Sequence, residues 1–374
     1  MTSQENINFV LTGDENYIMP LGVVMTSILK NLADNRKACF YLFTTNFSKS
    51  ALDKIYEIKK IRECEIVNIP MEKYIHYFKD IDISKFKLSY VSLVCYYRLL
   101  MLKILPQSVK KCFYVDGDMI IDTDLSKIYD KMSADQIASV VVEAFAMNDR
   151  KNILSHLYKM KAFAKFQKEP LKYPYFNAGF LLLNIDMARK EHLFDKAMKF
   201  LNENPNPPLA DQDTLNAIIG QQYTDKIEYL APEYNVFCDL GINSVKWSKN
   251  AYYPVKLIEK SIKKPKIYHY AGGCKPWLNN ENNHNSIWWK YCKLSPWKDI
   301  AKPQIQMNSW IVKFYLFNFL HILSYVCENH RNRQVFKIKF LKIFPLLKIK
   351  KKETRTDILL FGIIPLYIRK ITHD

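Results

Sequence analysis

Two aspartates separated by a single glycine are the residues of this sequence whose type and spacing most directly suggest chemistry. They stand in the stretch Tyr114-Val115-Asp116-Gly117-Asp118, at the end of a hydrophobic run typical of a buried strand. Two carboxylates on one side of a chain suit a hard divalent cation, which can in turn hold the phosphates of a nucleotide. A solvated turn has the same pattern, so the pair alone does not decide between the two.

A strand must deliver these carboxylates to a place where ligands bind, and the chain before Pro296 has the pattern of such a fold. Short runs rich in β-branched and aromatic residues alternate with segments of helical periodicity. This alternation predicts an α/β domain with a largely parallel sheet flanked by helices. In such sheets ligands lie beyond the carboxyl ends of the strands. We expect strands at Ile7–Thr12, Ala38–Thr44, Glu65–Ile69, Cys112–Ile121 and Ile137–Val142, the end of another at Phe180–Asn184, and helices near Leu21–Leu32, Ala51–Ile61 and Tyr90–Leu105.

The composition excludes several classes of protein. The 374 residues are 49% hydrophobic and 25% charged, which excludes collagen-like, coiled-coil and wholly disordered chains. Nine glycines leave little room for a glycine-rich phosphate loop. The eight cysteines are irregularly spaced without a C-x-x-C pair, so we expect neither a disulfide framework nor a structural zinc site. The N-terminus lacks the pattern of a signal peptide, and we therefore expect a cytoplasmic protein.

The chain is strongly basic, with 55 Lys and Arg against 37 Asp and Glu and a formal net charge of +18. Such an excess predicts a polyanionic partner: a nucleic acid, an anionic membrane surface or a phosphorylated substrate. Residues 301–374 hold fourteen basic residues and four acidic ones, which is more than half of the excess. Because we find no recognition-helix, RNP or zinc-finger pattern, we do not expect nucleic acid as the partner. A basic nucleic-acid-binding protein is the alternative function.

The composition changes near Pro296–Pro303, which indicates a separate C-terminal region. Trp310–Cys327 is apolar except for polar residues within one arc of a helical wheel, a pattern that predicts an amphipathic helix. Beyond it, Phe340-Leu-Lys-Ile-Phe-Pro345-Leu-Leu and Leu360-Phe-Gly-Ile-Ile-Pro365-Leu-Tyr look like two copies of one strand-forming unit. We therefore expect residues 296–374 to form a small, basic, amphipathic appendage of helix and strands that associates with a membrane.

Six motifs in order make the sequence resemble glycosyltransferase family 8, whose members are retaining, metal-dependent sugar-nucleotide transferases. The family includes bacterial lipopolysaccharide glucosyl- and galactosyltransferases and, more distantly, glycogenin. The resemblance spans roughly residues 6–290 and implies a GT-A type, Rossmann-like catalytic domain with a central, mostly parallel sheet over residues 1–295. The motifs are Gly13-Asp14-Glu15-Asn16-Tyr17, Tyr97-Arg98-Leu99, Tyr114-Val115-Asp116-Gly117-Asp118, Tyr175-Phe176-Asn177-Ala178-Gly179, Asp211-Gln212-Asp213-Thr214-Leu215-Asn216 and His269-Tyr270-Ala271-Gly272-Gly273-Cys274-Lys275-Pro276-Trp277.

The resemblance assigns a metal site to the aspartate pair. Asp116 and Asp118 would bind the cation together with His269, and this mixed set of carboxylates and imidazole suits Mn²⁺ better than Mg²⁺. Gly117, between the two carboxylates, would contact the nucleotide. Without the resemblance, His269 is more simply a histidine near a strand end that satisfies a backbone group.

The resemblance also assigns the residues that bind the UDP part of the donor. Asp14 and Asn16 would hydrogen-bond the uridine, with Tyr17 against the uracil ring. Lys275, together with backbone amides around Gly272, would contact the diphosphate and offset the charge that develops on the leaving UDP. The structural alternative for both segments is a polar surface turn.

Four further residues are implied at the transferred sugar. Arg98 would pair with the carboxylates or contact the sugar, Asn177 would contact the sugar hydroxyls, and Asp211 and Gln212 would line the acceptor side. We favour front-face attack by the acceptor hydroxyl, with the UDP phosphate accepting its proton; a double displacement through Asp211 is the alternative. The family often has an acid soon after the strand Ser139-Val140-Val141-Val142, whereas this chain offers Glu143 slightly later, so glucose and galactose both stay open.

The function implied by the resemblance is transfer of glucose or galactose from a UDP-sugar, in an α-linkage, to a lipid-linked saccharide such as lipopolysaccharide core. Other acceptors are O-antigen, capsule or glycoprotein. With its basic C-terminal region, the enzyme would lie on the inner face of the cytoplasmic membrane.

Overall fold

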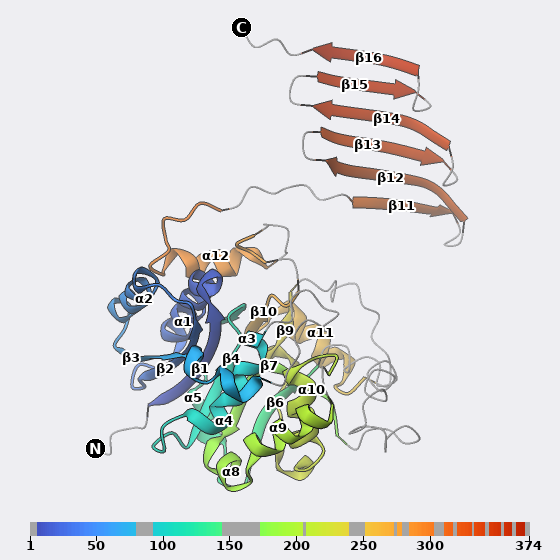
Figure 1. Cartoon of the computed structure of the whole chain (residues 1–374). Coiled ribbons are helices and arrows are strands. Elements are labelled where there is room, and N and C mark those ends of the chain that lie inside the picture. The colour runs from blue at the N-terminus through green and yellow to red at the C-terminus, as the bar shows by residue number, and fades with distance from the viewer. Residues whose placement is uncertain are drawn as a thin grey trace. The chain divides into compact units, whose positions relative to one another are not determined.

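The computed structural model describes residues 6–79, 93–143, 173–204, 207–238, 251–272, 275–278 and 284–302, and the strands of a C-terminal sheet between residues 310 and 370. The chain divides into two compact units, Met1–Pro303 and Gln304–Asp374. Each unit is described by itself (Figure 1). Among the described residues, no helix is both long and apolar enough to cross a bilayer.

The first unit is built around a seven-stranded sheet with the strand order β3-β2-β1-β4-β7-β6-β8. Four neighbouring pairs are parallel, whereas β7 runs antiparallel to both β4 and β6. The predicted α/β fold with a mostly parallel sheet is therefore confirmed. The strands are β1 (Ile7–Asp14), β2 (Ala38–Thr45), β3 (Cys64–Pro70), β4 (Lys111–Val115), β6 (Ala138–Val142), β7 (Phe176–Asn184) and β8 (Ile227–Tyr229).

The central strands form because their sequences suit a sheet that is covered on both faces. β1, β2 and β7 are buried along almost their whole length and are near-continuous apolar runs, not alternating ones. Phenylalanine rings from β2, β1, β4 and β7 stack in a ladder across the sheet, with centroids 5.4 to 5.5 Å apart: Phe40, Phe9, Phe113 and Phe180. This ladder aligns the carboxyl ends of β1 and β4 with the start of the antiparallel β7.

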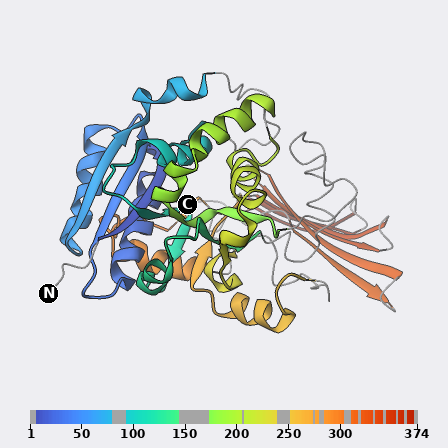
Figure 2. The same cartoon turned by 90° about the horizontal axis from the view of Figure 1, so that it is seen from below.

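Two groups of helices pack near this sheet (Figures 1 and 2). α1 (Ile18–Asn31) lies against α12 (Asn285–Lys293), and α4 (Met101–Ile104) lies against α8 (Ile185–Lys190) and α9 (Leu193–Glu203). The helices predicted after the first and second strands are confirmed, as is the part of Tyr90–Leu105 that lies within the described residues. The other described α-helices are α2 (Lys49–Tyr56), α3 (Leu93–Tyr97), α5 (Ser126–Lys131), α10 (Asp211–Leu215) and α11 (Val255–Lys263).

The prediction of one continuous strand over Cys112–Ile121 is wrong, and the break positions the aspartate pair. β4 ends at Val115, and after a turn the chain enters β5 (Met119–Ile121) of a second, three-stranded sheet, in the order β5-β10-β9. Its other strands are β10 (Ile267–His269) and β9 (Val236–Phe237). The Asp116 N–H donates to the Gly179 carbonyl at 2.8 Å, and Asp118 accepts from the Tyr270 N–H at 2.9 Å. The turn is thus bonded to β7 on one side and to the end of β10 on the other.

The second unit is a six-stranded antiparallel sheet with its strands in chain order. The predicted amphipathic helix over Trp310–Cys327 is wrong, because β11 and β12 pair there as a hairpin. Its β-branched and aromatic residues suit a pleated surface, and β13 offers β12 a second partner. The strands are β11 (Trp310–Leu316), β12 (Leu320–His330), β13 (Arg333–Phe340), β14 (Phe344–Lys352), β15 (Arg355–Leu360) and β16 (Ile364–Lys370).

The two copies of the strand-forming unit are confirmed as parts of hairpins. Each copy begins at the last residue of one strand, Phe340 or Leu360, and continues into the next strand. The prolines occupy equivalent places, since Pro345 pairs with Lys339 and Pro365 pairs with Leu359, each next to an irregularity in the register. The repeated sequence therefore reflects a repeated hairpin geometry.

Gly22 in α1 gives a direct test of the packing between the first unit's helices and the segment after α12. A Cβ atom at Gly22 would lie 1.9 Å from the ring of Trp297, which is itself only 8% exposed. We expect Gly22→Ala to lower the free energy of unfolding by about 1–3 kcal/mol, because the ring must move. In a Trp297→Leu background the same change should be neutral or stabilising, since alanine is the better helix former. An equal loss in both backgrounds, measured by urea denaturation, would contradict the packing argument.

Candidate active site

Residues that are far apart in the sequence meet at the ends of the central strands. Asp14 ends β1, the Asp116–Asp118 turn follows β4, Asn177 lies at the start of β7, and His269 ends the short β10. The antiparallel direction of β7 brings its first residues, not its last, to the carboxyl ends of β1 and β4. The structure thus places side chains from four of the predicted motifs at one end of the sheet.

Asp116, Asp118 and His269 form a cluster whose ligand atoms all lie within 4.8 Å of one another. The His269 Nε2 atom is 3.4 Å from Asp118 Oδ1 and 3.8 Å from Asp116 Oδ2. Asp118 Oδ1 is buried and has no hydrogen-bond donor within the described part of the chain. Because a buried carboxylate oxygen without a partner is unfavourable, this atom fits a metal ligand, and the two carboxylates and the imidazole suit a divalent cation.

Gly179 makes space beside this cluster. A Cβ atom at that position would lie 2.6 Å from Asp116 Oδ2 and 2.8 Å from the His269 ring carbon Cε1. The glycine of the Asn177-Ala178-Gly179 motif is therefore required by the close approach of β7 to two of the candidate metal ligands.

Lys275 places a buried positive charge against the same cluster. Its Nζ atom donates to Asp118 Oδ2 at 2.5 Å and to the Tyr270 carbonyl at 2.6 Å. Burial opposes ionisation of Asp118, but Lys275 and His269 outweigh it and hold the pKa of this carboxyl well below its usual range. Asp118 is thus ionised at neutral pH and available to a cation.

Arg98 connects the aspartate pair with α10. It follows α3, in the short 3-10 helix η6 (Arg98–Leu100), and its guanidinium lies 2.9 Å from Asp116 and 2.7 Å from Asp211. A third bond goes to the Ala178 carbonyl at 2.5 Å, and the group lies over the Tyr114 ring, 4.3 Å from its centroid. Burial alone would favour the neutral form, but the two carboxylates raise the pKa of Arg98, which stays charged.

Asp211, the first residue of α10, has a different environment from Asp118. It is buried, and burial raises the pKa of its carboxyl to about 7, with Arg98 opposing this effect and Asp116 adding to it. The carboxyl therefore changes protonation near neutral pH, and Arg98 is its ion-pair partner.

A cluster of amides and one carboxylate lies next to these charges. Asn177 Nδ2 donates to Glu143 at 2.8 Å and to Gln212 Oε1 at 2.9 Å, and Gln212 Nε2 donates to Glu143 at 3.1 Å. Asn216, one turn after Gln212, holds both the N–H and the carbonyl of Phe176 and so ties α10 to β7. Asn177 and Gln212, two of the residues predicted to lie at the transferred sugar, are thus in direct contact.

Two residues of this site were not among the predicted site residues. Glu143 directly follows β6, a position that the sequence marked only as a departure from the family pattern. Asn235 belongs to no motif, yet its amide lies between Asn177 and His269, at 2.7 and 2.8 Å. Its place before the two-residue strand β9 left no periodic signal in the sequence.

The predicted uridine-binding residues lie in the turn that follows β1. Asp14 accepts from the Asn16 N–H at 3.0 Å and caps the short helix η1 (Glu15–Tyr17). Tyr17 lies beside Gly117, where a Cβ atom would approach its ring to 3.1 Å, and its ring makes a T-shaped contact with Trp277, with centroids 5.9 Å apart. Burial, and then the charges of the aspartate pair, raise the pKa of Tyr17.

The remaining predicted residues follow β10. Gly272 lies three residues beyond His269, and Lys275 continues the same segment, whereas Gly273 and Cys274 lie outside the described residues. The structure therefore brings the predicted uridine, diphosphate and metal residues to one place.

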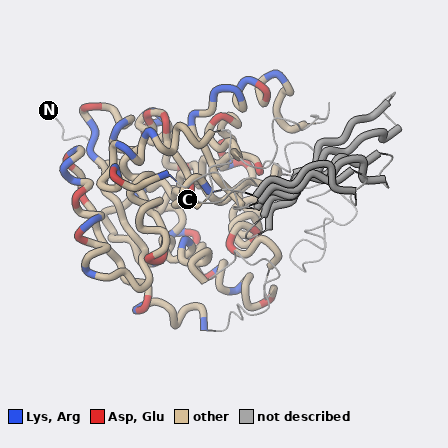
Figure 3. Tube along the Cα trace, turned by 90° about the horizontal axis from the view of Figure 1, so that it is seen from above, with Lys and Arg blue, Asp and Glu red and all other residues tan. Residues whose placement is uncertain are grey.

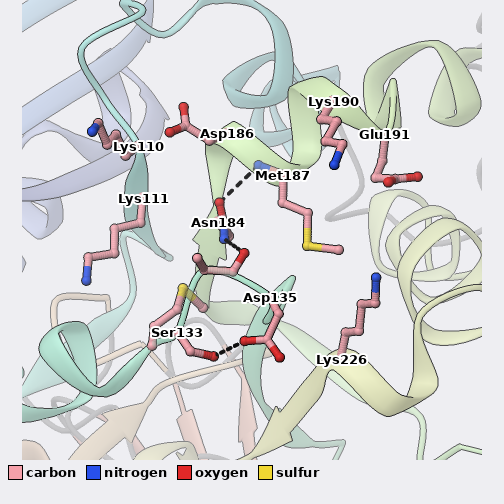
Figure 4. A pocket seen from close by; sticks show the side chains of 12 residues that line it. Lys110, Lys111, Ser133, Asp135, Asn184, Asp186, Met187, Lys190, Glu191 and Lys226 are labelled. Carbon is pink, nitrogen blue, oxygen red and sulfur yellow. Dashed lines mark hydrogen bonds between the residues drawn. The ribbon is translucent and has the colours of Figure 1, made fainter.

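A separate hollow of about 680 Å³ lies at the other end of the sheet, near the start of β4 and the end of β7 (Figure 4). None of the predicted site residues lines this hollow. Its charged lining residues are of both signs: Lys110, Lys111, Asp135, Asp186, Lys190, Glu191 and Lys226. We therefore place the candidate active site at the Asp116 end and not in this hollow.

The arginine bridge predicts a stability loss that depends on pH. We expect Arg98→Met to lower the free energy of unfolding by about 3–5 kcal/mol, because it removes the ion-pair partner of the buried Asp211 carboxylate. The folded-state pKa of Asp211 is already raised to about 7. A group whose pKa is raised on folding stabilises the folded state below its unfolded pKa, and this stabilisation is lost as the pH rises through its folded pKa. Arg98→Met removes the cation that opposes the raised pKa of Asp211. The stability loss of this variant should therefore be larger at pH 8 than at pH 5.

A matched control is Arg62→Met, measured by urea denaturation at both pH values. Arg62 donates to backbone carbonyls, including those of Leu32 at 2.6 Å and Arg36 at 2.8 Å, and its loss should be equal at pH 5 and pH 8. A pH-independent loss for Arg98→Met would show that the buried carboxylates do not depend on Arg98.

Comparisons with known proteins agree with this geometry. The profile of glycosyl transferase family 8 matches residues 8–281. General stress protein A of Bacillus subtilis (strain 168) is 24% identical over 316 residues, covering 82% of this chain and 99% of that protein. Lipopolysaccharide 1,2-glucosyltransferase of Escherichia coli (strain K12) is 24% identical over 347 residues, covering 88% of this chain and 93% of its relative.

The fold is similar to that of the galactosyltransferase LgtC, solved in complex with donor and acceptor sugar analogs. The TM-score is 0.59 at 16% identity, over 80% of this chain and 98% of LgtC. The family match covers the strands and turns that carry every predicted site residue, from Asp14 to Lys275. The chain therefore belongs to glycosyltransferase family 8, a family of retaining enzymes that transfer hexoses from nucleotide sugars.

Proposed function

We propose that this enzyme transfers glucose or galactose from a UDP-sugar to a saccharide hydroxyl, with retention of the α-configuration and with Mn²⁺. The observation that carries this proposal is the meeting of the Asp116, Asp118 and His269 cluster with a buried Lys275 and the amides of Asn177 and Gln212. A metal site, a phosphate-binding cation and sugar-binding amides at one sheet end are what such a donor requires. Mg²⁺ is the alternative cation.

The residues of the site have separate roles in this proposal. Asp14, Asn16 and Tyr17 bind the uridine, while Gly117 and the backbone near Gly272 leave space for the diphosphate. Asp116, Asp118 and His269 would hold the cation, which when bound supplies positive charge to the leaving diphosphate. Lys275 donates to the same phosphates and so stabilises the charge that develops on UDP.

Arg98, Asn177 and Gln212 act on the side of the transferred sugar. Arg98 holds Asp116 in place at 2.9 Å, and the amides of Asn177 and Gln212 orient the sugar hydroxyls. Glu143 accepts from both amides, at 2.8 and 3.1 Å, and so restricts which way their polar atoms face. This arrangement makes Glu143 a candidate for distinguishing glucose from galactose.

Asp211 bears on the choice of mechanism. A carboxylate nucleophile works best when it is ionised and free to reach the anomeric carbon. Asp211 is instead bonded to Arg98 at 2.7 Å, and its pKa is raised to about 7 by burial. These features favour front-face attack by the acceptor hydroxyl over a double displacement through Asp211.

We propose lipopolysaccharide core or another lipid-linked saccharide as the acceptor. The support is the similarity to lipopolysaccharide 1,2-glucosyltransferase along 88% of this chain. O-antigen, capsule and glycoprotein are the other acceptors to test. Nucleic acid fits less well, because Lys and Arg are interspersed with Asp and Glu over the described part of the first unit (Figure 3).

The second unit supports a peripheral place on the inner face of the cytoplasmic membrane. Pairing partners form rows across its sheet, and two rows on one face are apolar throughout. The opposite face carries most of the basic residues. The apolar rows are Trp310, Cys327, Phe336, Ile349, Ile358 and Tyr367, and Val312, Tyr325, Ile338, Leu347, Leu360 and Ile364; the basic residues are Lys313, Arg333, Lys337, Lys339, Lys348, Lys350, Lys352, Arg355 and Lys370.

We propose that the apolar face enters the interface of an anionic membrane. A single sheet cannot cover such a face by itself. Amphipathic helices bind with their apolar face at the boundary between headgroups and acyl chains, and we expect the same of this sheet. Basic residues near an anionic leaflet add about 1 kcal/mol each, and the effect falls off within a Debye length. Because the basic face lies on the far side of the sheet, its contribution should be the smaller one.

The catalytic proposal predicts a strict dependence on the metal cluster. Removing the hydrogen-bond partner of a metal ligand typically lowers metal affinity or activity about 10–100-fold. Removing the ligand itself should cost more, so we expect Asp118→Asn and His269→Ala each to lower kcat/KM by at least about 100-fold. The assay measures UDP release from UDP-glucose and UDP-galactose, with and without Mn²⁺. Asp135→Asn, in the hollow at the other sheet end, is the control and should retain full activity. No UDP release above background from any donor would refute the proposed reaction.

The membrane proposal predicts different effects for the two faces of the C-terminal sheet. We expect Ile349→Asn with Ile358→Asn to reduce co-sedimentation with phosphatidylglycerol vesicles about tenfold, because both residues belong to an apolar row. Lys348→Gln with Lys350→Gln should reduce it only a few-fold and only at low salt. Unchanged vesicle binding of the apolar variant, with a smaller oligomer in sedimentation velocity, would instead place a second copy of the chain on this face.

A further inference from the structure

Asn235 is a buried amide that belongs to none of the motifs yet lies between two parts of the candidate site. It follows the short helix η10 (Pro232–Tyr234), directly before β9, and is 3% exposed. One end of its side-chain amide is 2.7 Å from Asn177, and the other is 2.8 Å from the His269 ring. Asn235 therefore connects Asn177, a predicted sugar-binding residue, with His269, a candidate metal ligand.

The chemistry of the neighbours determines which atom of each amide faces which partner. A backbone N–H only donates, so the atom of Asn177 that faces the Gly179 N–H at 2.9 Å is its Oδ1, and the Nδ2 atom faces Glu143 at 2.8 Å. The Asn177 Oδ1 atom then accepts, and it does so from the Gly179 N–H at 2.9 Å and from Asn235 Nδ2 at 2.7 Å. The remaining polar atom of Asn235 is its oxygen, which faces His269 Nδ1.

This orientation decides the tautomer of His269. An amide oxygen can only accept, so the proton must be on His269 Nδ1, which donates to Asn235 Oδ1 at 2.8 Å. In the neutral ring, which is the form that binds a metal, the lone pair is then on Nε2, the nitrogen that faces Asp118 at 3.4 Å. Phe237 packs edge-on against the same ring, with centroids 4.8 Å apart, and limits its rotation.

We propose that Asn235 is a positioning residue that fixes the tautomer and orientation of His269 for the metal and, through Asn177, links the metal site to the sugar site. This inference rests on the proposed function for the identity of metal and donor. The hydrogen-bond partners of metal-ligating histidines commonly orient the ring and set which nitrogen binds. Here the partner is the uncharged amide of Asn235, whose other end is bonded to the predicted sugar-binding residue Asn177.

Two variants of Asn235 separate its two bonds. Asn235→Leu removes both, and we expect it to weaken binding of Mn²⁺ alone 10–100-fold by titration calorimetry and to remove the preference for the Nδ1–H form in the ¹⁵N spectrum of the His269 ring. Asn235→Asp keeps an acceptor for His269 but cannot donate to Asn177. We expect it to retain the tautomer and the affinity for Mn²⁺ within a few-fold, while the KM for the UDP-sugar rises.

Asn8→Leu is the matched control. Asn8 is also buried, and its amide donates to the Tyr129 hydroxyl at 3.1 Å and to the Lys111 carbonyl at 3.3 Å, at the end of the sheet away from the site. This variant should lose stability without any change in Mn²⁺ affinity or in the His269 spectrum. An unchanged tautomer and unchanged Mn²⁺ affinity in a folded Asn235→Leu variant would overturn the inference.

The same measurements separate this inference from the proposed function. If the wild-type enzyme binds no Mn²⁺, the proposed metal fails, but the ring spectra of the wild type and Asn235→Leu are recorded without metal and still decide whether Asn235 sets the tautomer. Equal spectra refute the inference, and different spectra support it.

Discussion

The site depends on one buried guanidinium that balances carboxylates from different parts of the chain. Arg98 lies between Asp116 and Asp211, at 2.9 and 2.7 Å, and without it the buried Asp211 would be driven further toward its neutral form. Its planar fork also reaches the Ala178 carbonyl, so the same group fixes β7 relative to the aspartate turn. A lysine has its three donors on one nitrogen, whereas Arg98 reaches the three acceptors from three nitrogens of one planar group. Arg98 therefore sets both the charge balance and the geometry of the site.

The turn between β4 and β5 is the second feature on which the site depends. At Gly117 the chain leaves the seven-stranded sheet and enters the three-stranded one, where β5 pairs with β10. The register of that pair sets Met119 opposite His269 and so brings the histidine to the aspartates. Each carboxylate then has its own cation, Arg98 for Asp116 and Lys275 for Asp118. Two sheets, and not one strand, are thus needed to assemble the metal cluster.

The amide cluster connects the sugar-binding side of the site with the candidate metal ligands through uncharged side chains. Asn177 is bonded to Glu143, Gln212 and Asn235, and Asn235 is bonded in turn to His269. Because every amide in this chain of contacts must present a donor to one side and an acceptor to the other, the Gly179 N–H, which only donates, orients Asn177, and Asn177 in turn orients Asn235. A change in the sugar site is thereby connected to the ring of a candidate metal ligand through uncharged groups.

The sequence by itself determined the α/β class, the central strands and the aspartate pair, because burial on both faces produces long apolar runs and the motifs are local. It could not determine contacts such as Lys275 with Asp118, since these residues are 157 positions apart and only the sheet topology unites them. Asn235 left no pattern in the sequence, and Glu143 left only a departure from the family pattern, because a buried hydrogen-bond partner needs only the right place and not a repeat. The C-terminal region shows the same limit: the apolar positions of Trp310–Cys327 fit a helical wheel, and only pairing with neighbouring strands decided for a sheet. Strand pairing joins residues across the chain, so tertiary structure alone decides it.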